Sequence, residues 1–341
     1  MKTQRIILFG LLMNMLVAQD PITVSNVSGV SANYSSLQAA LDTAPDSSTI
    51  YVYASPISYG DINITKQVFL YGAGMYPDTP GPLRSKLGNV AFATQQNDSS
   101  NGSTLSGFEV STTITLSTDM HDITIERNKG ENIVLSQNDN IMIINNYLGM
   151  YVDSEAGFSI YMVGSTNVSI INNYIHRTQS TSSSGSAIFY GGNALIVNND
   201  IHFFEQNHVN GFFRDGTHIV ENNIFTGNAT PGSNYLSQFN NNMSFDSGAI
   251  GQYNNNGSGN IIGTPVYAST GFGDQDWYGL DWGSPGLEAG TDGTDLGIQG
   301  GFYVFSNAYM PPLPYVQQLQ VPAVVPLNGL INVKITGKSH N

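Results

Sequence analysis

The sequence predicts an all-β fold in which a single chain coils into a parallel β-helix, and three observations support this prediction. A short, mostly β-branched stretch followed by Asn-Asn occurs four times between residues 141 and 225. The Asn-Asn pairs are separated by 27, 26 and 24 residues, a period typical of solenoids, in which each unit buries its apolar side against its neighbours. No copy shows the periodicity of a helix, which argues against helical and leucine-rich repeats.

The recurrent asparagine predicts a ladder of side-chain amides at one corner of the coil. Equivalent residues in neighbouring parallel strands lie roughly 4.8 Å apart, so each amide can hydrogen-bond to the next one along the stack. The predicted structural ladder consists of the second asparagine of each copy, Asn146, Asn173, Asn199 and Asn223. The apolar positions expected in the stacked strands beside it are Ile143, Ile170, Ile196 and Ile219.

Residues 1–18 are expected to be a secretory signal peptide. Lys2 and Arg5 form a basic start, an apolar stretch follows, and small residues precede a cleavage site near Ala18, as in signal peptides. The apolar stretch is too short to span a bilayer and no later segment reaches the required length. We therefore expect a secreted or cell-surface protein without a membrane span. Because the sequence has no cysteine, the stack itself has to supply the stability.

An N-terminal cap is expected at residues 19–48, with a short helix near residues 35–44. Leu37, Ala40 and Leu41 fall on one face of this helix, serines precede it and Pro45 follows it, which is the usual pattern of start and stop signals. Such a helix would cover the first coil, whose strand edge and core would otherwise be exposed.

The β-helix itself is expected to span residues 49–301, followed by an extended C-terminal segment, residues 302–341, with a final strand. Two excursions, residues 75–88 and 95–103, leave the coil near its start, and loops of this size often carry specificity. The alternating pattern of residues 329–336 predicts the final strand.

The charge balance restricts the partners. The chain has 11 basic and 25 acidic residues, a formal net charge of −14; without residues 1–18, 9 basic against 25 acidic residues leave −16. This charge disfavours nucleic acid and anionic membranes, and also polyanionic sugars unless a cation or a basic patch intervenes. Residues 274–295 are acidic, and calcium would find carboxylate oxygens there. No EF-hand loop or nonapeptide repeat is present, so we predict no metal site and no cofactor.

Two further stretches carry a family resemblance. Residues 36–74 join the helix to Thr49-Ile-Tyr-Val and Val68-Phe-Leu-Tyr-Gly-Ala-Gly, and residues 283–301 contain Ser-Pro-Gly-Leu-Glu-Ala-Gly and Asp-Leu-Gly. Together with the Asn-Asn copies they are similar to the pectate-lyase-like superfamily of right-handed, single-stranded parallel β-helices, closest to uncharacterised secreted bacterial members. The resemblance implies this fold and secretion. It implies no single chemistry, because the fold hosts lyases, hydrolases, esterases, tailspikes and adhesins.

A column of candidate site residues follows the asparagine corner. Aligning the copies places Gly149, His176, His202 and Thr226 in one register, so His176 and His202 are expected to be stacked neighbours. Adjacent imidazoles could supply a base near neutral pH. His176 is expected to bind the substrate, and Arg177 could pair with a uronate carboxylate. The alternative is that both histidines are half-exposed ladder residues just past a turn.

An aromatic stripe is a second candidate. Aligning the preceding strands on the glycines that follow them places Tyr161, Phe189 and Phe213 in one register, facing outward, where they could stack against sugar rings. Arg214 and Asp215 lie at its edge. The alternative for the three aromatic residues is a stack that a loop covers. The alternative for Arg214 and Asp215 is a surface ion pair that contributes little to stability.

These observations favour a monomeric, secreted carbohydrate-binding or surface-adhesion protein whose partner is a polysaccharide or cell-surface glycan. One alternative is a polysaccharide lyase or glycoside hydrolase acting on extracellular glycans, with Arg177, His202 and Arg214 as catalytic residues. Another is a structural surface spacer. Motifs similar to those of polygalacturonases, pectin esterases and lyases of this fold are absent from the sequence, which favours the binding protein.

Overall fold

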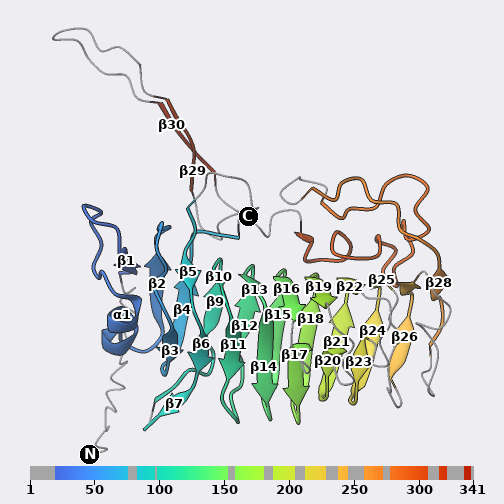
Figure 1. The fold of residues 1–341 in the computed structure, drawn as a ribbon, viewed down its shortest axis with the longest axis horizontal. Coiled ribbons are helices and arrows are strands. Elements are labelled where there is room, and N and C mark those ends of the chain that lie inside the picture. The colour runs from blue at the N-terminus through green and yellow to red at the C-terminus, as the bar shows by residue number, and fades with distance from the viewer. Residues whose placement is uncertain are drawn as a thin grey trace, which may run out of the picture.

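The computed structural model of the protein describes residues 20–75, 83–96, 98–152, 158–179, 187–203, 212–227, 237–244, 257–271, 277–305, 315–320 and 334–338. Across these residues the fold is an all-β parallel solenoid of about seven turns with one short helix (Figure 1). The predicted fold class is confirmed. The predicted signal peptide at residues 1–18 and residues 76–82 of the first excursion lie outside the described residues.

Three parallel sheets run along the solenoid, and successive coils add strands to each of them. The ten-stranded sheet consists of β1 (Ile22–Val24), β2 (Ser48–Val52), β4 (Val68–Tyr71), β9 (Thr104–Ser106), β12 (Thr124–Glu126), β15 (Asp139–Ile144), β18 (Thr166–Ile171), β21 (Asn193–Val197), β24 (Thr217–Glu221) and β26 (Gln238–Asn240). The nine-stranded sheet consists of β5 (Lys86–Leu87), β10 (Glu109–Val110), β13 (Lys129–Gly130), β16 (Tyr147–Val152), β19 (Tyr174–Gln179), β22 (Asp200–Phe203), β25 (Ile224–Gly227), β27 (Met243–Ser244) and β28 (Ile261–Ile262). The seven-stranded sheet consists of β3 (Ile62–Ile64), β6 (Val90–Phe92), β11 (Thr113–Leu116), β14 (Asn132–Ser136), β17 (Phe158–Val163), β20 (Ala187–Tyr190) and β23 (Phe213–Arg214).

Two antiparallel pairs lie outside these sheets. They are β7 (Thr94–Gln95) with β8 (Asp98–Ser99), and β29 (Tyr315–Gln320) with β30 (Lys334–Lys338). β7 and β8 form a hairpin within the second predicted excursion. β30 lies in the segment for which a final strand was predicted, and its partner is β29.

Side chains that alternate inward from the three sheets form one continuous core. Ile143, Ile170 and Ile196 occupy equivalent positions in β15, β18 and β21 and are fully buried, as predicted. The fourth predicted member was wrong: Val220 takes this position, whereas Ile219 pairs with Leu195 and is 45% exposed. Ile143, Ile170 and Ile196 each precede the second asparagine of their copy by three residues, and in the fourth copy the residue at this distance is Val220.

The predicted asparagine ladder is confirmed and is longer than the four copies. From Asn146 on, each amide oxygen accepts hydrogen bonds from the backbone N–H and the side-chain N–H of the preceding ladder asparagine, as between Asn146 and Asn173 at 2.8 and 3.0 Å. The oxygen of Asn128 accepts from the Phe108 N–H. Each side-chain nitrogen also donates to a carbonyl of an adjacent strand, for example Asn173 to Ile143 at 2.8 Å. The complete ladder is Asn128, Asn146, Asn173, Asn199, Asn223, Asn242 and Asn260.

The predicted helix near residues 35–44 is α1 (Leu37–Thr43), and the Ser36 side chain caps it by accepting from the Ala39 N–H. Leu37, Ala40 and Leu41 are buried against the end of the solenoid. β1 precedes this helix and pairs in parallel with β2, so the ten-stranded sheet begins inside the predicted cap segment. Within the described ranges, no helix has the length and apolar character needed to cross a membrane.

Residues 277–305, which we name the strap, lie along the asparagine corner on the outside of the coils (Figure 1, orange to brown). The first asparagine of each Asn-Asn pair holds the strap. Asn241 donates to the Ala289 carbonyl, Asn222 exchanges two hydrogen bonds with Thr291, and Asn172 donates to the Ile298 carbonyl. The strap therefore runs back toward the earlier coils. The stretch at residues 283–301 belongs to this strap, and the last strand of the three sheets is β28.

Candidate functional site

The predicted histidine column is present in the nine-stranded sheet. Gly149, His176, His202 and Thr226 are in register on β16, β19, β22 and β25. A Cβ atom at Gly149 would lie 2.3 Å from Cε1 of His176, so the glycine leaves the space that the imidazole occupies. Thr226 hydrogen-bonds through its hydroxyl to Nδ1 of His202. The structure therefore brings the two histidines together as the alignment predicted.

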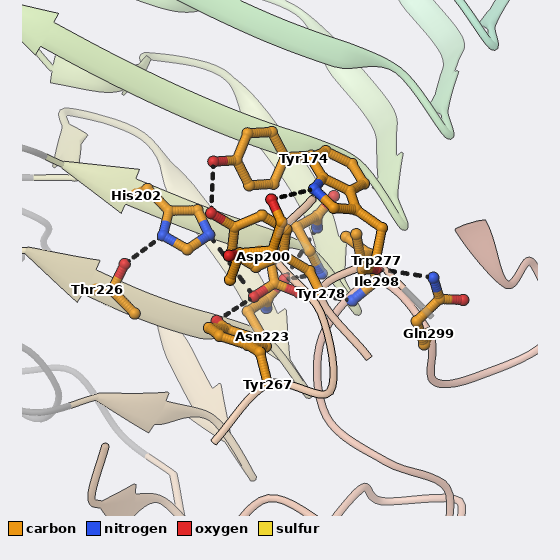
Figure 2. Close-up of polar contacts among 12 residues, drawn as sticks. Tyr174, Asp200, His202, Asn223, Thr226, Tyr267, Trp277, Tyr278, Ile298 and Gln299 are labelled. Carbon is orange, nitrogen blue, oxygen red and sulfur yellow. Dashed lines mark hydrogen bonds and ion pairs between the residues drawn. The ribbon is translucent and has the colours of Figure 1, made fainter. Parts of the chain in front are cut away.

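The strap covers half of this column. Trp277 and Tyr278 from the strap pack their rings 4.6 and 4.7 Å from that of Tyr174, and Tyr278 lies 4.8 Å from the ring of His202. Figure 2 shows these rings closing over the strands. His202 is 4% exposed as a result. The predicted catalytic role for His202 needed access to a polysaccharide, and the structure does not give it.

A buried carboxyl group, Asp200, lies at the centre of this cluster and is 0% exposed. Its two oxygens accept hydrogen bonds from the Tyr267 hydroxyl at 2.6 Å and from the Ile298 N–H of the strap at 2.9 Å (Figure 2). Nε2 of His202 is 3.8 Å away. Burial raises the pKa of Asp200 to about 7, and the two hydrogen bonds oppose this rise.

The histidines of the column are poor bases. Burial, with a smaller contribution from the neighbouring His176, lowers the pKa of His202 to about 3. Burial also lowers the pKa of His176 to about 4, with a contribution from Lys129. Both imidazoles are therefore neutral at physiological pH, and they accept protons less readily than a catalytic base whose pKa lies near the working pH.

The predicted partner of this column, Arg177, lies inside the solenoid. It follows the buried Ile175 by two positions on β19, so its side chain shares the inward face of the strand, and it is 0% exposed. The expectation that Arg177 meets a uronate on the surface is thus corrected. The alignment had placed it beside His176 without considering which face each side chain takes.

The predicted aromatic stripe was wrong in the register of Tyr161 and in the direction of the two phenylalanines, whereas Phe189 and Phe213 are in register with each other as predicted. Ile160, Phe189 and Phe213 form one inward column, and Phe189 and Phe213 are 0% and 1% exposed with their rings stacked 5.1 Å apart. Turn length explains the error: seven positions separate Tyr161 from Val168, but four separate Tyr190 from Ala194. Aligning the strands on the glycines of these turns therefore placed β17 one residue out of register with β20 and β23.

The outward column next to it contains Tyr161, Tyr190 and Arg214. The Arg214 guanidinium lies 5.1 Å from the centre of the Tyr190 ring, and Phe158 stacks on Tyr190 at 4.6 Å. Tyr161 meets Tyr190 edge to face at 5.2 Å. We name Phe158, Tyr161, Tyr190 and Arg214 the aromatic cluster. All four are partly exposed, and the Asp215 carboxylate is 4.0 Å from Nε of Arg214.

Two hollows mark the outer faces of other sheets. One, of about 690 Å³, lies on the ten-stranded sheet. The other, of about 380 Å³, lies on the nine-stranded sheet beside the strap, and its lining includes Lys129, Glu131, Tyr147 and His176. His176, predicted to bind substrate, therefore faces a hollow. Glu131 carries a raised pKa because of burial.

Sequence reasoning missed Asp200 and Tyr190. Asp200 had a signal, since the other copies carry an apolar or aromatic residue directly after Asn-Asn and a carboxylate there breaks the pattern. In the part of the chain that the structure describes, no three histidine, aspartate or glutamate side chains are placed to hold a metal; Asp274 and Asp276 of the acidic run lie outside it. The sequence matches no protein-family model, and no curated protein shows significant similarity to it.

Proposed function

We propose that this chain is a secreted, pectate-lyase-like β-helix protein that binds a polysaccharide on the outer face of its seven-stranded sheet. The observation that carries the proposal is the aromatic cluster, which sets three aromatic rings and a guanidinium side by side on a parallel sheet. The apolar face of a sugar ring packs well against an aromatic side chain, and the guanidinium supplies hydrogen-bond donors for oxygen atoms.

The side chains of the cluster pack against one another, which favours binding. Tyr190 lies between Phe158, which is stacked on it at an interplanar angle of 17°, and the Arg214 guanidinium. Strands β17, β20 and β23 fix the spacing of the column. Side chains that are already ordered lose little conformational entropy on binding, so more of the contact energy contributes to affinity.

The location of the charges supports a glycan over other partners. The chain has a net charge of −14, and Arg214 provides a cation within the cluster. The local cation allows a sugar with an acidic group to approach a protein whose overall charge would repel it. The pattern of residues 1–18 supports secretion, and N-terminal sequencing of secreted protein beginning at Gln19 would test it.

Affinity measurements on a double variant and a single control variant test the binding proposal. Tyr161→Ala together with Arg214→Gln is expected to weaken polysaccharide binding about tenfold or more, because about 1.4 kcal/mol of lost contact corresponds to a factor of ten. Tyr51→Ala is a matched control: Tyr51 and Tyr71 form another outward aromatic pair, 5.9 Å apart, on the ten-stranded sheet. Equal affinities for the wild type and the double variant, at unchanged melting temperature, would contradict the proposal.

A further inference from the structure

We infer that the outer face of the ten-stranded sheet carries a second binding groove, which takes an uncharged segment of a polysaccharide chain. A hollow of about 690 Å³ lies there, over β15, β18, β21, β24 and β26. This volume falls within the range of natural small-molecule sites. The groove lies on a different sheet from the aromatic cluster, and none of its lining residues belongs to that cluster.

Two columns of outward side chains line the groove. The first column contains an amide or hydroxyl side chain in each coil, and the second combines polar and apolar side chains at positions two residues further along each strand. The first column is Asn140, Asn167, Asn193 and Thr217, and the second is Ser169, Leu195, Ile219 and Gln238. Five strands at roughly 4.8 Å spacing give a length of roughly 19 Å, which suits an oligosaccharide segment better than a single sugar.

The polar groups of the groove are directed to the outside. Asn193, Thr217 and Gln238 are exposed, and within the described residues their side chains make no hydrogen bond. Asn167 donates to Asp139 at 2.8 Å, which fixes the orientation of its amide. Amides and hydroxyls both donate and accept hydrogen bonds, and this matches the many hydroxyl groups of a sugar.

The apolar groups match the other side of a sugar ring. Leu195 and Ile219 are neighbours in register and are 37% and 45% exposed. They form an apolar floor between polar side chains, an arrangement typical of ligand sites. Backbone N–H and C=O groups of these strands are engaged in the parallel sheet, so a peptide cannot add to this face as a strand.

The charge around the groove selects against ionic ligands. None of its lining side chains is acidic or basic, apart from His218, which is 1% exposed and whose pKa burial lowers to about 4. Two carboxylates flank the groove: Asp122 accepts a hydrogen bond from Asn140, and Asp139 accepts one from Asn167. These carboxylates repel acidic sugars, and no cation in the lining offsets them.

The position of the groove explains how both surfaces could hold one chain. Tyr190 of the aromatic cluster and Asn193 of the groove are separated by Gly191 and Gly192 alone. Both glycines have positive φ, and a Cβ atom at Gly192 would meet the Met162 carbonyl oxygen at 2.4 Å. Three residues span at most about 10 Å, so a long polysaccharide can pass over this corner. The groove inference stands even if the aromatic cluster binds nothing.

Calorimetric titration with short oligosaccharides tests the groove. The probes are hexasaccharides of β-linked glucose, xylose or mannose, with hexagalacturonate as the acidic counterpart. We expect the wild type to bind one or more of the neutral hexasaccharides, and Asn193→Ala with Ile219→Thr to weaken that binding about tenfold or more. Ile262→Thr is the matched control, because Ile262 is 61% exposed on another sheet.

A second measurement locates the ligand directly. In methyl-labelled protein, a neutral hexasaccharide is expected to shift the signals of Leu195 and Ile219 and to leave that of Ile262 unchanged. Tyr161→Ala separates this inference from the proposed function, since it alters the aromatic cluster and leaves the groove intact. The inference is overturned if no neutral hexasaccharide binds, if only hexagalacturonate binds, or if binding leaves both groove methyl signals unshifted.

Discussion

We expect Asp200, the carboxyl group buried beneath the strap, to make the closure of the strap dependent on pH. Its pKa is about 7 in the closed structure against an ordinary value of 3.8. A raised pKa means that the carboxyl group contributes stability that is fully present below pH 3.8 and is lost as the pH rises through 7. Between these values the equilibrium constant for opening increases about tenfold per pH unit, or about 80-fold from pH 5 to pH 8.

The other titratable groups facing Asp200 leave this window undisturbed. His202 and, beside it, His176 have pKa values of about 3 and about 4, so both are already neutral at pH 5. Tyr174, Tyr267 and Tyr278 have pKa values raised above that of an ordinary tyrosine, because burial disfavours the phenolate. Asparagine at position 200 keeps an oxygen for the Ile298 N–H and carries no charge at any of these pH values.

Tryptophan fluorescence can measure the opening. The chain has two tryptophans. Both belong to the strap, but Trp282 is 90% exposed, whereas Trp277 packs against Tyr174 of β19 and is 3% exposed. In a Trp282→Phe background, acrylamide quenching therefore reports on Trp277. We expect quenching to rise from pH 5 to pH 8 with Asp200 present and to stay constant in Asp200→Asn.

A strap variant that changes charge elsewhere provides the control. Glu288 is exposed on the strap, so Glu288→Gln should retain the full pH dependence of Trp277 quenching. An identical pH dependence in Asp200→Asn, or none in the protein with Asp200, would refute the argument that a carboxyl group beneath the strap controls its closure.

Three further substitutions test the packing. Asn173→Ala removes the amide partner of the buried Asn146 N–H and of the Ile143 carbonyl, and should destabilise folding by about 1–3 kcal/mol in denaturant titration. The exposed Asn193→Ala should cost less than about 0.5 kcal/mol, and equal effects would contradict the ladder. Gly297→Ala adds a Cβ atom 2.4 Å from the buried carboxylate and strains φ at +81°, so protease should cleave the strap faster. Gly149→Val should displace His176 and alter its NMR pKa toward that of an exposed imidazole, and an unchanged pKa would disprove that contact.

The sequence by itself determined the solenoid. A repeat of apolar residues ending in Asn-Asn is a local pattern. Stacking equal copies buries the apolar residues of every copy and gives its amides hydrogen-bond partners. The ladder, the stacked Ile143 and Ile170, and the histidine column follow directly, because they are counted from one fixed corner. Ser36 and its helix also follow, since capping is a matter of a few adjacent residues.

Only the tertiary structure decided which side chains are accessible. The aromatic column depended on turns whose lengths differ between coils, so the inward Phe189 and the outward Tyr190 could not be told apart from the glycines. The burial of Asp200 and His202 depended on the strap, about 70 to 100 residues later in the chain. No local pattern pairs Asp200 with Ile298, because hydrogen bonds between distant segments form only once the coils have placed the first asparagines in a row.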